Sequence, residues 1–159
     1  IALEPIPENA ALMRDNLAAN GVMDRVRIIE GMAGRSGNGQ IHYGYGDSEV
    51  GLHHAFIGNS DLGQSGTHQV ATMPSLSLYE LLAGQPDPVL MKVDCEGGEY
   101  DFLAASNGML QNVPLILGEW HPLHGTRTQI DLAALLSETH IVTFTGPATG
   151  PGGFRAVRR

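Results

Sequence analysis

The sequence predicts an α/β fold in which helices cover both faces of the sheet. Short apolar runs typical of buried strands alternate along the chain with segments typical of helices. The apolar run 89–93 leads directly into carboxylates and a glycine pair, as a parallel strand does at the carboxyl edge of such a sheet. The chain has 159 residues, which is enough for one domain with its own core.

The first elements follow from short local signals. The apolar residues 1–3 predict a strand that stops at a Glu-Pro pair. A helix is predicted over 7–19, because proline and glutamate suit its first turn and Asn-Gly follows its end. Strands are predicted over 25–30 and 40–43, and the second of them should form a hairpin after a turn region over 34–39.

Residues 44–68 carry no helical or strand period. They are rich in glycine, serine, aspartate, asparagine and histidine, so we expect a long loop. A loop of that length in a compact domain is uncommon and is usually functional or disordered. We expect this segment to shape a binding pocket.

The second half of the chain continues the alternation of strands and helices. A serine that precedes Glu80 suits the cap of a short helix. The last two strands surround a Gly/Pro turn and should pair antiparallel. The predicted strands are 69–73, 89–93, 114–118, 141–144 and 154–157. A short helix is predicted within 75–82, and further helices over 98–106 and 131–138.

Composition excludes several classes of protein. Nine lysines and arginines stand against 17 aspartates and glutamates, which gives a net charge of −8. That charge argues against a nucleic-acid binder and against attraction to anionic membranes. No apolar stretch approaches the roughly 20 residues that span a bilayer. One cysteine, Cys95, allows no internal disulfide and no cysteine-built zinc site, so we expect a cytoplasmic protein.

Three acids, Asp94, Glu96 and Glu99, crowd the exit of the predicted strand 89–93. Strand alternation would place Lys92, Asp94 and Glu96 on one face. Grouped carboxylates can supply a general base for a hydroxyl or ligands for Mg²⁺. The glycine pair 97–98 allows a tight turn and close approach of a ligand. Alternatively, the acids cap the next helix, which explains one acid well but three poorly.

Glu119 and His121 follow the next predicted strand. Exits of neighbouring strands can converge, so these residues could join the three acids. His121 could act as a base, a metal ligand or a substrate contact. The alternative is a packed loop with a hydrogen-bonded histidine. Cys95 lies between two acids, which disfavour a thiolate, so we expect a buried strand residue and not a nucleophile.

Glu4 stands at the exit of the first predicted strand. In nucleotide-binding folds, an acid at such an exit accepts hydrogen bonds from ribose hydroxyls, which two carboxylate oxygens can do together. The alternative is an exposed acid that precedes a helix.

Three stretches of the sequence resemble a known family. The segment Lys-Val-Asp-Cys-Glu-Gly-Gly-Glu over 92–99, followed by Phe102-Leu103, is similar to the signature of the FkbM-type methyltransferases. The opening Leu-Glu-Pro-Ile-Pro-Glu-Asn over 3–9, with Leu12 and Asn16 behind it, resembles the family's second-strand motif. The stretch 73–82, Met-Pro-Ser-Leu-Ser-Leu-Tyr-Glu-Leu-Leu, is similar to the segment before the signature, so the resemblance covers essentially the whole chain.

The resemblance implies an S-adenosylmethionine-dependent O-methyltransferase with a Rossmann-like, doubly wound sheet of seven strands. The acceptor would be a hydroxyl of a small molecule or sugar, and Mg²⁺ is an optional further cofactor. Glu4 would bind the cofactor ribose, the turn Gly31-Met32-Ala33 would lie near the adenine, and Asp94 would lie near the methyl donor and acceptor. The expected catalytic residues are Asp94, Glu96 and His121, and the expected substrate contacts are Glu99 and Glu119.

The chain departs from the family pattern at its start. The first strand and its glycine-rich loop should precede Glu4 by roughly 20 residues. Neither is in the sequence, so we expect residues 1–159 to form one domain that is truncated at its amino terminus. Two rival functions stay open: a non-catalytic binding or scaffold domain, and a metal-dependent hydrolase that uses Asp94, Glu96, Glu119 and His121.

Overall fold

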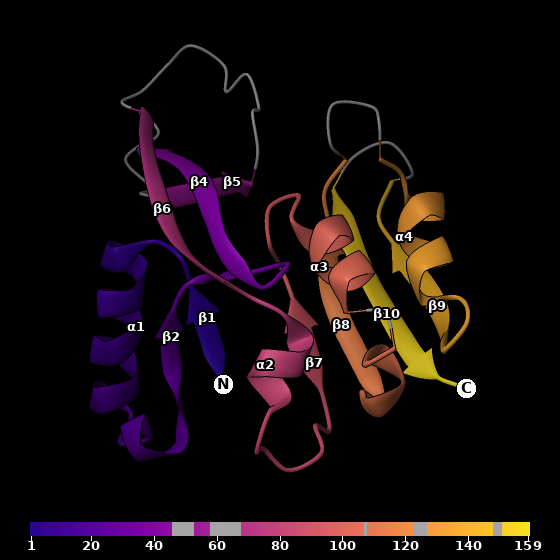
Figure 1. Ribbon diagram of the computed structural model, residues 1–159, viewed down its shortest axis with the longest axis horizontal. Helices are drawn as coiled ribbons and strands as arrows, with labels where there is room; N and C mark the ends of the chain where they lie inside the picture. The colour runs from indigo at the N-terminus through magenta and orange to yellow at the C-terminus, as the bar shows by residue number, and fades with distance from the viewer. Residues whose placement is uncertain (46–52, 58–67, 107, 123–126, 148–150) are drawn as a thin grey trace. The chain divides into compact units, whose positions relative to one another are not determined.

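The computed structural model describes residues 1–45, 53–57, 68–106, 108–122, 127–147 and 151–159 (Figure 1). The chain divides into two compact units, residues 1–76 and residues 77–159. Each unit combines strands with helices, which confirms the α/β class.

The first unit opens with a strand, a helix and a second parallel strand. β1 and β2 pair in parallel, with Ala2 opposite Ile28, and the helix α1 connects them. Proline stands in the first turn of α1, where backbone N–H groups have no acceptor within the helix, so the missing N–H of proline costs no hydrogen bond. The elements are β1 (Ala2–Glu4), α1 (Pro7–Ala19), a 3₁₀ turn (Met23–Arg25) and β2 (Ile28–Glu30).

A second sheet completes this unit, with the strand order β3-β6-β4-β5. β6 pairs in parallel with β3 and antiparallel with β4, and β4 pairs antiparallel with β5. Ile6, Met32 and Ile41 form a buried cluster in this unit. The strands are β3 (Met32–Ala33), β4 (Gly37–Tyr45), β5 (His53–Ile57) and β6 (His68–Leu76).

The second unit contains a four-stranded sheet with the order β7-β8-β10-β9. β7 and β8 are parallel, so their carboxyl ends lie at the same edge, while β10 runs antiparallel to β8 and β9. Leu103, Ile116, Trp120, Leu132 and Leu136 are fully or almost fully buried. The elements are α2 (Leu78–Leu82), β7 (Met91–Val93), α3 (Glu99–Ala105), a 3₁₀ turn (Leu110–Asn112), β8 (Leu115–Trp120), α4 (Gln129–Leu136), β9 (His140–Thr145) and β10 (Gly152–Arg158).

Two helices of this unit begin with reciprocal caps. The Ser77 hydroxyl accepts a hydrogen bond from the Glu80 N–H, and the Glu80 carboxylate accepts one from the Ser77 N–H. Thr128 and Asp131 make the same pair of bonds at the start of α4. The predicted serine cap before Glu80 is therefore confirmed, and each cap satisfies N–H groups that a helix start leaves open.

Several sequence predictions need correction. The expected turn region over 34–39 is wrong in part, because β4 already begins at Gly37. The expected loop over 44–68 contains the strand 53–57, which pairs with β4, while residues 46–52 and 58–67 lie outside the described residues. The strand predicted over 114–118 continues to Trp120, so Glu119 lies inside the strand and not after it.

The remaining strands and helices lie close to their predicted positions, and the antiparallel pair at the end of the chain is confirmed. The doubly wound arrangement of the whole sheet stays a prediction. Within the described part of the chain, no helix has both the length and the apolar content to cross a membrane.

Candidate functional site

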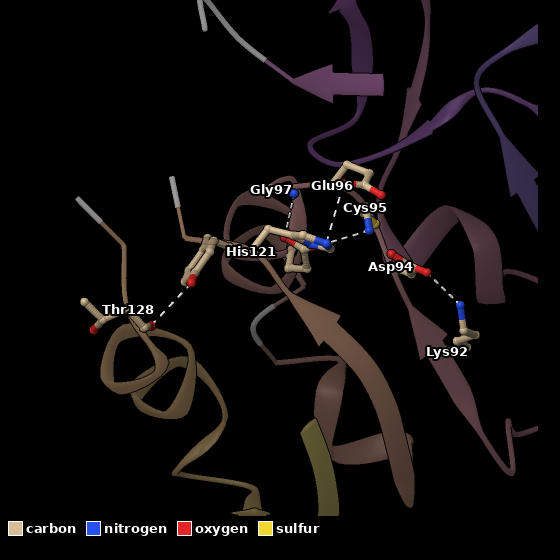
Figure 2. A network of polar contacts seen from close by, with 9 residues as sticks. Lys92, Asp94, Cys95, Glu96, Gly97, His121 and Thr128 are labelled. Atoms are coloured by element: carbon tan, nitrogen blue, oxygen red, sulfur yellow. Dashed lines mark hydrogen bonds and ion pairs between the residues drawn. The ribbon is translucent and has the colours of Figure 1, made fainter. Parts of the chain in front are cut away.

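The candidate site lies at the carboxyl ends of β7 and β8. β7 ends at Val93, and a turn over 94–98 leads into α3, which begins at Glu99. His121 follows the last residue of the neighbouring parallel strand, β8. Figure 2 shows Asp94, Glu96 and His121 gathered at this edge. The expectation that the two strand exits converge is confirmed for His121.

Glu99 is the buried centre of this group, with no exposed surface. Its Oε1 atom accepts a hydrogen bond from the Cys95 N–H at 3.0 Å, and its Oε2 atom accepts one from the Gly97 N–H at 2.9 Å. Oε1 also lies 2.9 Å from Nδ1 of His121. Both carboxylate oxygens are therefore engaged by groups of the chain itself, as a buried charge requires.

His121 lies between two carboxylates. Its Nδ1 atom faces Glu99, and its Nε2 atom lies 3.5 Å from Oε2 of Glu96. The hydrogen bond with Glu99 raises the pKa of His121 above the usual 6.5; burial opposes the shift, and the charges of Glu99, Glu96 and Asp94 add to it. The side chain keeps 17% of its surface exposed, so a ligand can reach the ring.

Asp94 and Glu96 do not share a strand face as alternation predicted. The prediction was wrong because β7 ends at Val93 and Glu96 has φ 47°, in the left-handed region that only a few non-glycine residues adopt. Asp94 is still joined to Lys92, whose Nζ lies 2.9 Å from Oδ2. The side chains of Asp94 and Glu96 are 30% and 33% exposed, so both can meet a ligand.

The alternative that these acids cap the next helix does not hold for Glu99. The residue that caps α3 is Gly98, which makes no side-chain cap bond, and Glu99 binds N–H groups of the turn before the helix. Cys95 is only partly buried and lies in the turn after β7, so the expectation of a buried strand residue is wrong. Burial and then the charge of Glu99 raise the pKa of its thiol to about 12, which keeps the thiol protonated near neutral pH and disfavours nucleophilic attack.

The structure does not bring Glu119 into this group. Glu119 lies within β8, opposite Gly153 of β10, and is exposed on the side of the strand away from the buried Trp120. Within the described residues, no hydrogen bond or ion pair joins Glu119 to His121. Its role as a substrate contact stays a prediction.

Glu4 is the last residue of β1, in the first unit. Its Oε1 atom accepts a hydrogen bond from the Ile6 N–H at 2.8 Å, which holds the carboxylate at the strand exit. Glu4 also lines an open hollow beside α1, with Asn9 and Asn16. This arrangement leaves Glu4 accessible to a ligand and fits an acceptor of hydroxyl hydrogen bonds.

The turn that follows β2 begins at Gly31. Its N–H donates to the Glu4 carbonyl at 3.3 Å, and a Cβ at this position would lie 2.9 Å from the Pro74 carbonyl oxygen, so only glycine fits without a shift. The Met32 side chain packs in the core of the unit. The proximity of Gly31, Met32 and Ala33 to an adenine stays a prediction.

Asp94, Glu99 and His121 also have the spacing of a possible metal site. One donor atom from each of the three residues lies within 4.8 Å of the others. Glu99, however, already uses both oxygens for hydrogen bonds. The set therefore fits a hydrogen-bonded histidine better than a metal centre.

Sequence reasoning missed the contacts that hold the neighbouring segment. The Tyr100 hydroxyl donates to the Thr128 carbonyl at 3.3 Å, and the Arg127 guanidinium lies 5.3 Å from the centre of the Tyr100 ring. These contacts fix the start of α4 beside α3. The signal in the sequence that could have predicted these contacts was Tyr100, the aromatic residue directly after Glu99.

Comparison with known proteins gives one match, to a family model. No curated protein and no solved structure matches the chain. The model of the methyltransferase FkbM domain matches residues 1–144, which is most of the chain. The chain therefore belongs to the FkbM methyltransferase domain family.

Proposed function

We propose that this protein transfers a methyl group from S-adenosylmethionine to a hydroxyl of a small molecule or a sugar. The observation that carries the proposal is the convergence of Asp94, Glu96 and His121 at one edge of the sheet, in a chain of a methyltransferase family. Proton acceptors and negative charges are what this reaction needs from a protein. The net charge of −8 favours a small acceptor over a nucleic acid.

The residues of the chain fit S-adenosylmethionine in two respects. Glu4 presents a fixed carboxylate that suits two ribose hydroxyls, because its Oε1 is held by the Ile6 N–H. Asp94 and Glu96 present partly exposed negative charges, which attract a positively charged sulfonium. When bound, S-adenosylmethionine supplies a methyl group on a cationic sulfur that an oxygen nucleophile can displace in line.

His121 is the best proton acceptor of the site. The hydroxyl of the acceptor would donate to Nε2 of the ring, because Nδ1 is engaged by Glu99. A pKa raised above 6.5 strengthens the ring as a base, provided that the working pH leaves part of it neutral. Asp94 lies close enough to orient the same hydroxyl.

The proposal is tested by a methyl-transfer assay on the full natural protein. Methyl-labelled S-adenosylmethionine is offered with a panel of sugars, alcohols and phenols, and the labelled product and S-adenosylhomocysteine are measured. Asp94→Asn and His121→Asn should each lower the rate by about 100-fold or more. Asp101→Asn is the control, since it removes a carboxylate that is 71% exposed on α3.

The outcomes separate the rival functions. Transfer to a panel member that depends on Asp94 and His121 supports the proposal. No transfer by a protein that still binds S-adenosylhomocysteine would favour a scaffold domain. Transfer at the normal rate in both variants would overturn the assignment of the site.

A divalent cation is the second candidate at this site, either as Mg²⁺ for methyl transfer or as the metal of a hydrolase. The spacing of Asp94, Glu99 and His121 favours it. The engaged oxygens of Glu99 oppose it, because metal binding would have to break bonds to two N–H groups. Methyl transfer should therefore be unchanged by EDTA. Loss of activity in EDTA that Mg²⁺ restores would establish the metal instead.

A further inference from the structure

We propose that Glu99 is the positioning residue of the site: it holds His121 with a proton on Nδ1 and directs Nε2 toward Glu96 and the acceptor. The inference rests on the proposed function of His121 as the proton acceptor. It gives Glu99 a role different from the substrate contact expected from the sequence.

The position of Glu99 excludes direct contact with a substrate in this conformation. The side chain has no exposed surface, and both oxygens accept hydrogen bonds from the N–H groups of Cys95 and Gly97. A carboxylate that is held by two donors acts toward a third group as an acceptor. The contact of 2.9 Å with His121 therefore places the hydrogen on Nδ1 of the ring.

This tautomer decides what the other nitrogen can do. With the hydrogen on Nδ1, the neutral ring keeps its lone pair on Nε2, where it can accept a proton. Nε2 lies on the side of Glu96, whose carboxylate is partly exposed. A ring with the hydrogen on Nε2 would present a donor at this place and could not act as the base.

Glu99 also fixes the place of Glu96. Its two N–H partners, Cys95 and Gly97, lie directly before and directly after Glu96 in the chain. The two bonds hold the backbone on both sides of a residue with φ 47°, a conformation that a non-glycine residue adopts only when its surroundings impose it. The Glu99 carboxylate therefore positions both His121 and the turn that carries Glu96. Figure 2 shows Glu96 beside His121.

The charged groups around His121 define the pH dependence. Asp94 faces the ring from the end of β7, Glu96 from the turn and Glu99 from α3. Lys92 is ion-paired with Asp94 and offsets part of that charge. Replacement of Glu99 by glutamine removes the acid that makes the shortest contact, so the protonated ring loses its strongest stabilising partner.

The first test is nitrogen NMR of the His121 ring in the wild-type protein across a pH titration. At a pH where the ring is neutral, we expect the hydrogen on Nδ1. A hydrogen on Nε2 would overturn the proposal. This measurement needs no substitution, so it holds even if a variant at Glu99 folds poorly.

The second test is the pH profile of methyl transfer in Glu99→Gln, with the acceptor found in the panel assay. We expect kcat to fall by about 100-fold, with little change in KM for S-adenosylmethionine. The rise of activity with pH should move to lower pH, because the neutral ring forms more readily without the charge of Glu99. Asp101→Asn, which changes the same charge on the same helix at an exposed position, should keep the wild-type profile.

The outcomes distinguish this inference from the proposed function. Transfer by Glu99→Gln with the wild-type pH profile would overturn the role of Glu99 and leave the methyltransferase proposal standing. Absence of transfer in the wild-type protein would overturn the proposed function, and with it the catalytic meaning of the Glu99–His121 contact.

Discussion

Replacement of Glu99 by alanine should strongly destabilise the second unit. The substitution removes the acceptor for two buried N–H groups, those of Cys95 and Gly97, and the partner of His121. A hydrogen bond to a charged group contributes about 1.5–3 kcal/mol, so the two backbone bonds alone amount to roughly 3–6 kcal/mol. The substitution also removes the free-energy cost of burying a charged carboxylate, and this offsets part of the sum.

We therefore expect Glu99→Ala to lower the free energy of unfolding by about 3 kcal/mol. Glu99→Gln keeps the volume and one acceptor oxygen, and should cost about 2 kcal/mol. Asp101→Asn should stay within about 0.5 kcal/mol of the wild type, because its side chain is exposed. These values are a large fraction of the stability of an ordinary domain.

The assay is urea unfolding at pH 7, followed by tryptophan fluorescence. Trp120 is the one tryptophan of the sequence, is fully buried, and lies in the same unit as Glu99. Equal slopes for the variants would show that the shift in midpoint measures stability. A Glu99→Ala protein within about 0.5 kcal/mol of the wild type would refute the reasoning that this carboxylate holds the turn.

Three further predictions concern other parts of the second unit. Gly118→Ala should lower the free energy of unfolding by about 3 kcal/mol in the same assay. The added Cβ would lie 2.5 Å from the Val93 carbonyl oxygen and 2.4 Å from the Phe154 ring. A loss below about 1 kcal/mol would contradict this packing. His121→Asn should cost most stability below pH 6.5 and progressively less as the pH rises through the raised pKa of His121 in the folded protein, because the protonated ring is the form that stabilises the fold. Urea unfolding of both proteins at several pH values measures the difference in stability. A difference that grows with pH would contradict the prediction. Cys95, with a pKa of about 12, should react with iodoacetamide at pH 8 at least about 100-fold more slowly in the folded protein than in urea, and equal rates would show that the thiol is accessible and ionised.

The sequence was sufficient for much of the second unit, because its elements carry local signals. Two short apolar runs around a Gly/Pro turn predicted β9 and β10, and the serine before Glu80 predicted the start of α2. The strand before the acids was predicted two residues too long at its start, since Val89 and Leu90 are apolar but lie exposed outside β7. Local apolar character cannot show which residues a neighbouring strand will pair.

The sequence predicted which residues gather at the candidate site, but not how their side chains are oriented. Its acids and His121 were identified because several charged groups at strand exits have no packing role. The orientation of Glu96 was mistaken, since strand alternation does not continue past Val93 and the left-handed backbone is imposed by two hydrogen bonds from the turn to Glu99. Such bonds join residues whose geometry is set only once the turn has formed, so no sequence period predicts them.

The first unit shows a different limit. The expected loop over 44–68 contains β5, which pairs with β4 although its residues follow no clear pattern of their own. Pairing with a neighbour decides whether such a segment is a strand, and the sequence of the segment alone does not contain that information.

The most direct test of the central claim is isothermal titration of S-adenosylhomocysteine into the full natural protein and into its Glu4→Gln variant. We expect saturable binding of one molecule by the wild type and an affinity lower by about 10-fold in the variant, which corresponds to about 1.4 kcal/mol. Equal affinities would remove Glu4 from the cofactor site. Absence of binding by the wild type would contradict the account of this chain as a methyltransferase that uses S-adenosylmethionine.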